Sequence, residues 1–135
     1  MATTGGPAGA MPVGRMVAIH ALDATGAYAH TAVLEFRVGG RFAGTIDLGT
    51  SVEGPVTIEV DDPASSIEIR ARFLGQAIDA QVLPHQDAIS VRFSRVAPHF
   101  AAGRMAVATC PDGTSGRPCV TCRDAKSGAS WRMCC

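Results

Sequence analysis

The cysteines carry the most distinctive chemistry of this 135-residue chain, because all five lie between residues 110 and 135. The C-V-T-C run from 119 to 122 has the spacing with which one turn of chain can direct two thiolates at a single metal ion. Cys110 and Cys134 would complete the four ligands of a tetrahedral structural zinc site. We therefore predict a four-cysteine zinc site formed by Cys110, Cys119, Cys122 and Cys134, with Zn as the candidate cofactor. Cys135 is left over.

Disulfide bonds are the alternative use of these thiols. An odd number of cysteines leaves one thiol free or paired between chains. The sequence shows no secretion signal and no apolar run long enough for a membrane helix, which predicts a cytoplasmic location. Thiols stay reduced in the cytoplasm, so this location favours metal binding over structural disulfides. Cys119 and Cys122 would also suit a redox pair, although the strand–helix context of a thioredoxin-like motif is missing.

A third interpretation rests on residues 125–135, which read A-K-S-G-A-S-W-R-M-C-C. This run resembles the end of epidermin-type lanthipeptide cores, in which an Ala-Lys-Thr-Gly segment precedes a closing Cys-Cys. The resemblance implies a precursor whose thiols attack dehydrated Ser or Thr residues to form thioether rings. Ser127, at the position of the family's Thr, and Ser130 would then be acceptors for Cys134 and Cys135. Ser, Thr and Cys residues also alternate upstream, at Thr114, Ser115, Cys119, Thr121 and Cys122.

The sequence contains no catalytic signature. It has no G-x-S-x-G, P-loop, H-E-x-x-H or dinucleotide-binding fingerprint. The four histidines are scattered, with His20 and His30 in or beside strand patterns and His85 and His99 after prolines. A thiol enzyme would need one of them beside a cysteine, which the sequence does not decide. We therefore predict a non-catalytic protein.

The segment from Arg15 to Ser94 has the pattern of a series of β-strands, because apolar and polar residues alternate with a period of two. Gly39-Gly40 predicts a two-residue hairpin, and Gly75-Gln76 a second tight reversal. The pattern predicts an all-β fold, a small antiparallel β-sandwich of about seven strands, with a small closed barrel as the alternative. The predicted inward-facing residues are Val17, Ile19, Ala21, Leu34, Phe36, Val38, Ile46, Leu48, Val56, Ile58, Val60, Ile67, Ile69, Ala71, Phe73, Ile78, Ala80, Val82, Ile89, Val91 and Phe93.

Composition divides the chain into three parts. Residues 1–14 are rich in Gly, Ala, Thr and Pro and are predicted to be a flexible arm, and residues 15–97 form the sandwich. Residues 98–135 are predicted to be a linker and an irregular Cys-rich tail. The tail's only large apolar residues after Cys110 are Val120, Trp131 and Met133, too few for a core of its own. The body is expected to fold without the tail, so replacing all five cysteines by serine should leave its stability unchanged.

Charge excludes some classes of partner. Twelve basic and twelve acidic side chains cancel, and aromatic residues make up 5% of the chain, so neither nucleic acid nor membrane binding is indicated. The cancellation conceals a net charge of +3 from Pro98 onward and −3 before it. A basic tail could fold against the acidic body or bind an acidic partner, but so mild an imbalance is more often a solvated surface. We predict a non-catalytic binding or scaffold module that presents its Cys-rich tail and that binds a protein partner or self-associates. A zinc-binding tail and a thioether-modified precursor peptide are the alternatives.

Overall fold

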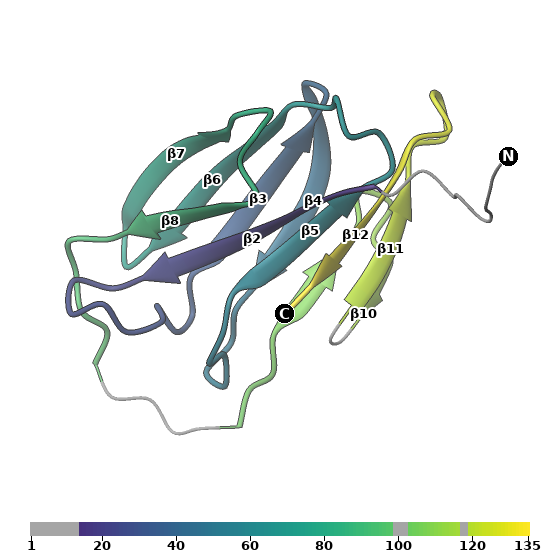
Figure 1. Cartoon of the computed structure of the whole chain (residues 1–135). Helices are drawn as coiled ribbons and strands as arrows, with labels where there is room; N and C mark the ends of the chain where they lie inside the picture. Colours follow the sequence, from purple (N-terminus) through teal and green to yellow (C-terminus); the bar gives the residue numbers. More distant parts are fainter. Residues whose placement is uncertain (1–13, 99–102, 117–118) are drawn as a thin grey trace, which may run out of the picture.

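Two β-sheets packed face to face make up the molecule (Figure 1). The computed structural model describes residues 14–98, 103–116 and 119–135. Eleven strands lie in these ranges, in a six-stranded and a five-stranded sheet. The predicted all-β sandwich is therefore confirmed. The predicted N-terminal arm lies outside the described residues, apart from Gly14.

The first seven strands occupy the segment in which alternation predicted about seven. Strand β8 pairs with β2 in parallel, whereas every other paired strand in the two sheets is antiparallel. The strands are β2 (Arg15–Leu22), β3 (Val33–Val38), β4 (Arg41–Asp47), β5 (Val56–Val60), β6 (Ile67–Phe73), β7 (Gln76–Val82) and β8 (Ala88–Arg92).

The tail differs from its predicted irregular form, because it supplies strands to both sheets. Its strands are β9 (Val107–Thr109), β10 (Ser115–Gly116), β11 (Cys119–Arg123) and β12 (Ser130–Cys134). The six-stranded sheet has the order β10-β9-β4-β3-β6-β7, and the five-stranded sheet the order β11-β12-β5-β2-β8. Strand β9 thus extends the six-stranded sheet beside β4, and β12 extends the other beside β5. The boundary expected at residue 98 does not separate two structural units.

The core lies between the two sheets and uses the predicted alternation. The inward residues of β2, β5 and β6 are all buried, as the sequence pattern predicts. On the side of the sandwich where β7 and β8 lie, the core is less completely shielded from solvent. The apolar residues Ile78, Ala80 and Ile89 are only partly buried there. The tail completes the other side with Val120, Trp131 and Met133.

Turns and outward charges also follow from the sequence. Gly39 and Gly40 form the predicted hairpin turn with φ values of 60° and 80°. The second reversal is centred on Leu74 and Gly75, one residue earlier than predicted, and Leu74 takes a φ of 50° there.

On the outer face of the six-stranded sheet, charges pair across strands, as between Arg70 and Asp79 at 3.1 Å. Such exposed pairs add little to stability.

Candidate binding cleft at the disulfide end

The two cysteines of the C-x-x-C run point to opposite sides of one sheet. Both lie on β11, where successive side chains alternate between faces, so a separation of three residues turns them apart. Cys122 is 3% exposed and faces the core, whereas Cys119 is half-buried on the outer face. A turn that aimed both thiolates at one ion would require a different local structure.

One disulfide joins the two sheets through the core. Cys110 follows β9 of the six-stranded sheet, and its sulfur is bonded to that of Cys122 on β11 of the other sheet. The two Cα atoms are 5.5 Å apart, within the usual range for a disulfide. Cys110 is 4% exposed, so this bond fixes the spacing of the sheets from within.

A second disulfide joins two neighbouring strands on the outer face. Cys119 and Cys134 are register partners in the β11–β12 ladder, with Cα atoms 4.2 Å apart. This distance is close to that of a non-hydrogen-bonded antiparallel pair, in which side chains approach most closely. Cys135 has a free thiol, and burial raises its pKa to about 11. Cys135 is exposed as a whole residue and lines a depression together with Val52 and Met105.

The predicted zinc site is therefore not assembled. The structure pairs Cys110 with Cys122 and Cys119 with Cys134, on opposite faces of the five-stranded sheet. Among the described residues, no group of three or more His, Cys, Asp or Glu side chains is placed to hold a metal ion. The physical reason is the extended strand at Cys119–Cys122, which sequence spacing alone did not reveal.

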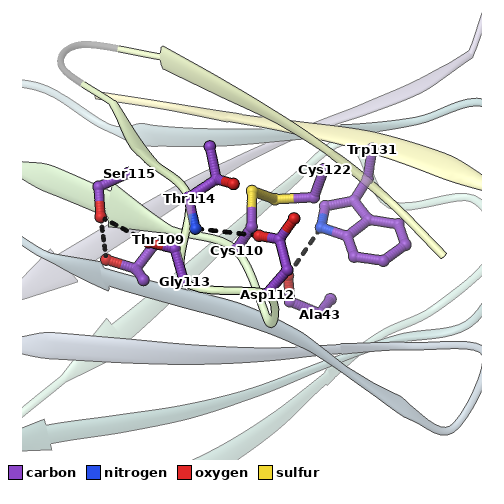
Figure 2. Close-up of a disulfide and its surroundings, with 9 residues drawn as sticks. All are labelled: Ala43, Thr109, Cys110, Asp112, Gly113, Thr114, Ser115, Cys122 and Trp131. Atoms are coloured by element: carbon purple, nitrogen blue, oxygen red, sulfur yellow. Dashed lines mark hydrogen bonds between the residues drawn. A yellow bond between two sulfur atoms is a disulfide. The ribbon is translucent and has the colours of Figure 1, made fainter. Parts of the chain in front are cut away.

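A tryptophan packs beside the inter-sheet disulfide and ties the sheets together a second time. Trp131 on β12 is the register partner of Cys122 and is 6% exposed. Its indole Nε1–H donates to the carbonyl oxygen of Ala43 on β4, at 2.7 Å (Figure 2). The β3–β4 register shifts here, so Ala43 stands without a partner on β3. The bulge frees a carbonyl that the tryptophan can use.

The turn beside this disulfide is held by its own hydrogen bonds. The Cys110 amide donates to the Thr114 carbonyl at 2.7 Å, and the Gly113 amide to the Cys110 carbonyl at 2.9 Å. The Asp112 carboxylate accepts the Thr114 amide at 2.9 Å (Figure 2), and this bond holds the pKa of Asp112 below its usual value. The loop that follows β9 thus has a defined shape.

Loops of both sheets surround a cleft of about 510 Å³ above Trp131. The β3–β4 hairpin, the turn after Cys110 and the β11–β12 turn contribute its walls. Loops at one end of a β-sandwich are common binding surfaces, because a rigid scaffold positions them. The lining residues are Val38, Gly39, Arg41, Phe42, Ser65, Pro111, Asp112, Arg123, Asp124, Ala125, Ser127, Ala129 and Trp131.

Acidic and basic side chains lie next to each other in the lining of the cleft. Arg41 from the body and Asp124 from the tail form an ion pair at 2.7 Å. Hydrogen bonds from the Lys126 amide and the Ser127 hydroxyl, with Arg41 nearby, lower the pKa of Asp124. Asp124 is therefore ionised at neutral pH. Arg123 lies next to it with an exposed side chain.

Four of the other residues singled out in the sequence, His20, His30, Ser127 and Ser130, each have a hydrogen-bonding partner in the fold. His20 Nδ1 is 3.1 Å from the Tyr28 hydroxyl, and His30 Nε2 is 3.2 Å from the Val52 carbonyl, so both have structural contacts. His99 lies outside the described residues. Ser127 and Ser130, the acceptors that the lanthipeptide resemblance implies, hydrogen-bond through their hydroxyls to Asp124 and Asp61.

Sequence reasoning missed the cleft, because its walls come from segments far apart in the chain. The exposed Phe42 beside the predicted Gly39-Gly40 hairpin was the available signal, together with the single tryptophan. Comparisons of the chain with protein-family models, with curated proteins and with solved structures found no match. In the described part of the chain, no helix is long and apolar enough to cross a membrane.

Proposed function

We propose that the chain is a non-catalytic β-sandwich module that binds a protein partner in the cleft at its disulfide end. The observation that carries this proposal is the cleft itself, which both sheets line and which the Cys110–Cys122 bond supports. A rigid frame lowers the entropy lost on binding, because few side chains and loops need to become ordered. In this proposal the tail forms part of the binding surface.

The cleft's residue types favour a protein segment as the ligand. Phe42 is 43% exposed at the rim, although large aromatic side chains are usually covered. Arg41 and Arg123 lie in the same lining. Aromatic and arginine side chains contribute most of the binding energy at protein interfaces. We expect a partner segment that inserts an apolar side chain beside Phe42 and offers a carboxylate to Arg123.

Two disulfides support an oxidising environment as the place where the module works. Structural disulfides persist in such environments and are rare in the cytoplasm. This proposal replaces the cytoplasmic location expected from the absence of a visible signal. Blocking of free thiols during rapid denaturing extraction from the native host, followed by peptide mass analysis, tests it. We expect Cys135 alone to be labelled, and labelling of all five cysteines would reject the proposed environment.

The same mass analysis distinguishes the zinc and thioether hypotheses. A zinc-binding tail requires four free thiolates and metal that purifies with the protein. A thioether-modified tail requires loss of water at Ser or Thr residues. The participation of β9 and β12 in the two sheets supports a structural tail over both alternatives.

Partner capture with cleft variants tests the binding proposal. Full-length protein carrying Phe42→Ala or Arg123→Ala should lose a partner that the unaltered chain recovers from its native host. Met16→Ala is the matched control, because Met16 is also exposed but lies on β2, away from the cleft. If the Phe42 and Met16 variants recover the same proteins in the same amounts, the cleft is not the binding surface.

A further inference from the structure

Strand β7 is a long, regular strand at the outer edge of the six-stranded sheet. It pairs with β6 over seven consecutive residues without a register shift, and it forms the end of the sheet order (Figure 1). An edge strand directs half of its backbone N–H and C=O groups away from the sheet. In the described part of the chain, the backbone of residues 76–82 forms hydrogen bonds with the backbone of β6 and with no other backbone group.

Proteins usually protect such an edge, and β7 lacks the usual means of protection. The strand contains no proline, lysine or bulge, and its one charge, Asp79, is engaged by Arg70 of β6. Its inward residues Ile78 and Ala80 are only partly buried. At the opposite end of the same sheet, β10 is two residues long. Exposed, regular edge strands of this kind pair with other strands.

We propose that β7 is a self-association surface, on which a second copy of this chain adds its own β7 in antiparallel orientation. A two-fold axis at Ala80 makes the strand complementary to itself. Asp79 then lies opposite Gln81 of the second copy, so a carboxylate meets an amide donor instead of another carboxylate. Ile78 lies opposite Val82 of the second copy, so apolar residues also match.

Burial of exposed surface supports this register. Leu83 directly follows β7, and its side chain is 56% exposed. The axis at Ala80 places Leu83 opposite Ala77 of the second copy, which is exposed and has no charge. An axis at Asp79 would instead place two carboxylates opposite each other, which is destabilising. The register that keeps the two carboxylates apart is thus also the one that covers Leu83.

Charge substitutions at Gln81 test both the association and its register. Sedimentation of the full chain from micromolar to millimolar concentration should show a monomer–dimer equilibrium. Gln81→Lys should tighten it, because the lysine faces Asp79 of the second copy, and Gln81→Asp should weaken it. Each change acts twice in a two-fold dimer, which predicts a roughly 2- to 30-fold change in the dissociation constant in either direction. Gln81 is exposed but lies opposite Glu68 of β6, so thermal unfolding at micromolar concentration must show that both variants keep the fold before their dissociation constants are compared.

Two controls keep the result specific. All proteins carry Cys135→Ser, so that no disulfide between copies contributes. Ser90→Lys and Ser90→Asp make equal charge changes on the exposed residue Ser90 of β8, at the edge of the other sheet, and should leave the dissociation constant unchanged.

A chain that stays monomeric at millimolar concentration overturns the proposal. A dimer that does not respond in opposite directions to the two Gln81 variants overturns it too. Neither result bears on the cleft, which shares no residue with β7.

Discussion

At the scale of single residues, Gly44 shows how closely the tail packs on the body. A Cβ atom at Gly44 would lie 2.4 Å from the Thr109 carbonyl oxygen and 2.8 Å from Met133 Cε. Its φ of 128° is also one that other residues rarely adopt. Only glycine allows β4 to approach β9 and β12 so closely.

Gly44→Ala should therefore destabilise the protein by at least about 2 kcal/mol, through overpacking and backbone strain. Urea denaturation of the purified variant measures this loss. Gly54→Ala is the control, because no atom of the described residues lies within 4 Å of a Cβ built there. Equal stability of the two variants would mean that β4 and β9 are not packed as the structure has them.

The Cys135 thiol should react slowly with alkylating reagents at neutral pH. Its pKa is raised by burial from 9.0 to about 11, so the reactive thiolate is scarce below that pH. The rate of alkylation by iodoacetamide should keep rising up to about pH 11. The unfolded chain loses this proton more readily, so the free energy of unfolding should decrease as pH rises from 9 toward 11.

A rate that levels off near pH 9 would show that the Cys135 thiol is fully solvated. Cys135→Ser provides the control for stability, because it should remove this part of the alkaline decrease. Both measurements require that the two disulfides stay intact, which mass analysis of the alkylated protein verifies.

At the scale of elements, the two disulfides should contribute unequally. They close segments of similar length, with sequence separations of 12 and 15 residues. Each is therefore expected to add about 3 kcal/mol to the free energy of unfolding, because it restricts the unfolded chain. Cys110 and Cys122 are also buried in the core. Replacing this pair by alanine should therefore cost about 1–2 kcal/mol more than replacing Cys119 and Cys134, because it leaves a cavity.

Denaturant titration of the two double variants, both with Cys135→Ser, measures the difference. A larger loss for the Cys119 and Cys134 variant would contradict the packing of the inter-sheet bond. The expectation from sequence, that removing all cysteines leaves stability unchanged, assumed that the tail stands apart from the core. The structure favours the opposite result.

The strands from β2 to β8 could be predicted because each has one apolar and one polar face. Strands β10, β11 and β12 escaped prediction because glycine, proline and serine surround them, and because cysteine was considered only as a chemical group. Buried cysteine packs as a small apolar residue. When cysteine is counted as apolar, apolar residues recur at every second position of the tail strands, as they do in the body. The pairs are Val120 with Cys122 and Trp131 with Met133. The disulfide pairing and the cleft depend on sheet order, which no local pattern contains.

At the scale of the whole molecule, the tail closes one side of the sandwich. The chain places β9 beside β4 and β12 beside β5, so strands from the last third cover residues of the first half. Arg104 of the tail also pairs with Asp47 of the body, at 3.2 Å. The opposite side, at β7, has no such cover among the described residues.

A chain ending at residue 97 should consequently fail to fold. It would leave β4 and β5 as sheet edges and expose core residues such as Ile46 and Ile58, which are fully buried in the full chain. The free energy lost with this apolar burial exceeds the small free energy of unfolding that is typical of small domains. Circular dichroism should show no cooperative thermal transition for this chain, and amide resonances should be poorly dispersed.

The full chain with Cys135→Ser is the reference for this experiment, because it keeps every strand and both disulfides. A shortened chain that melts cooperatively at the same temperature would restore the hypothesis of a self-sufficient body with an attached tail. An intermediate outcome is also informative: a shortened chain that folds only at high concentration would indicate that exposed edges pair between copies. The edges of β4 and β5 would then behave as β7 is proposed to behave in the intact protein, since all three would present unpaired backbone groups.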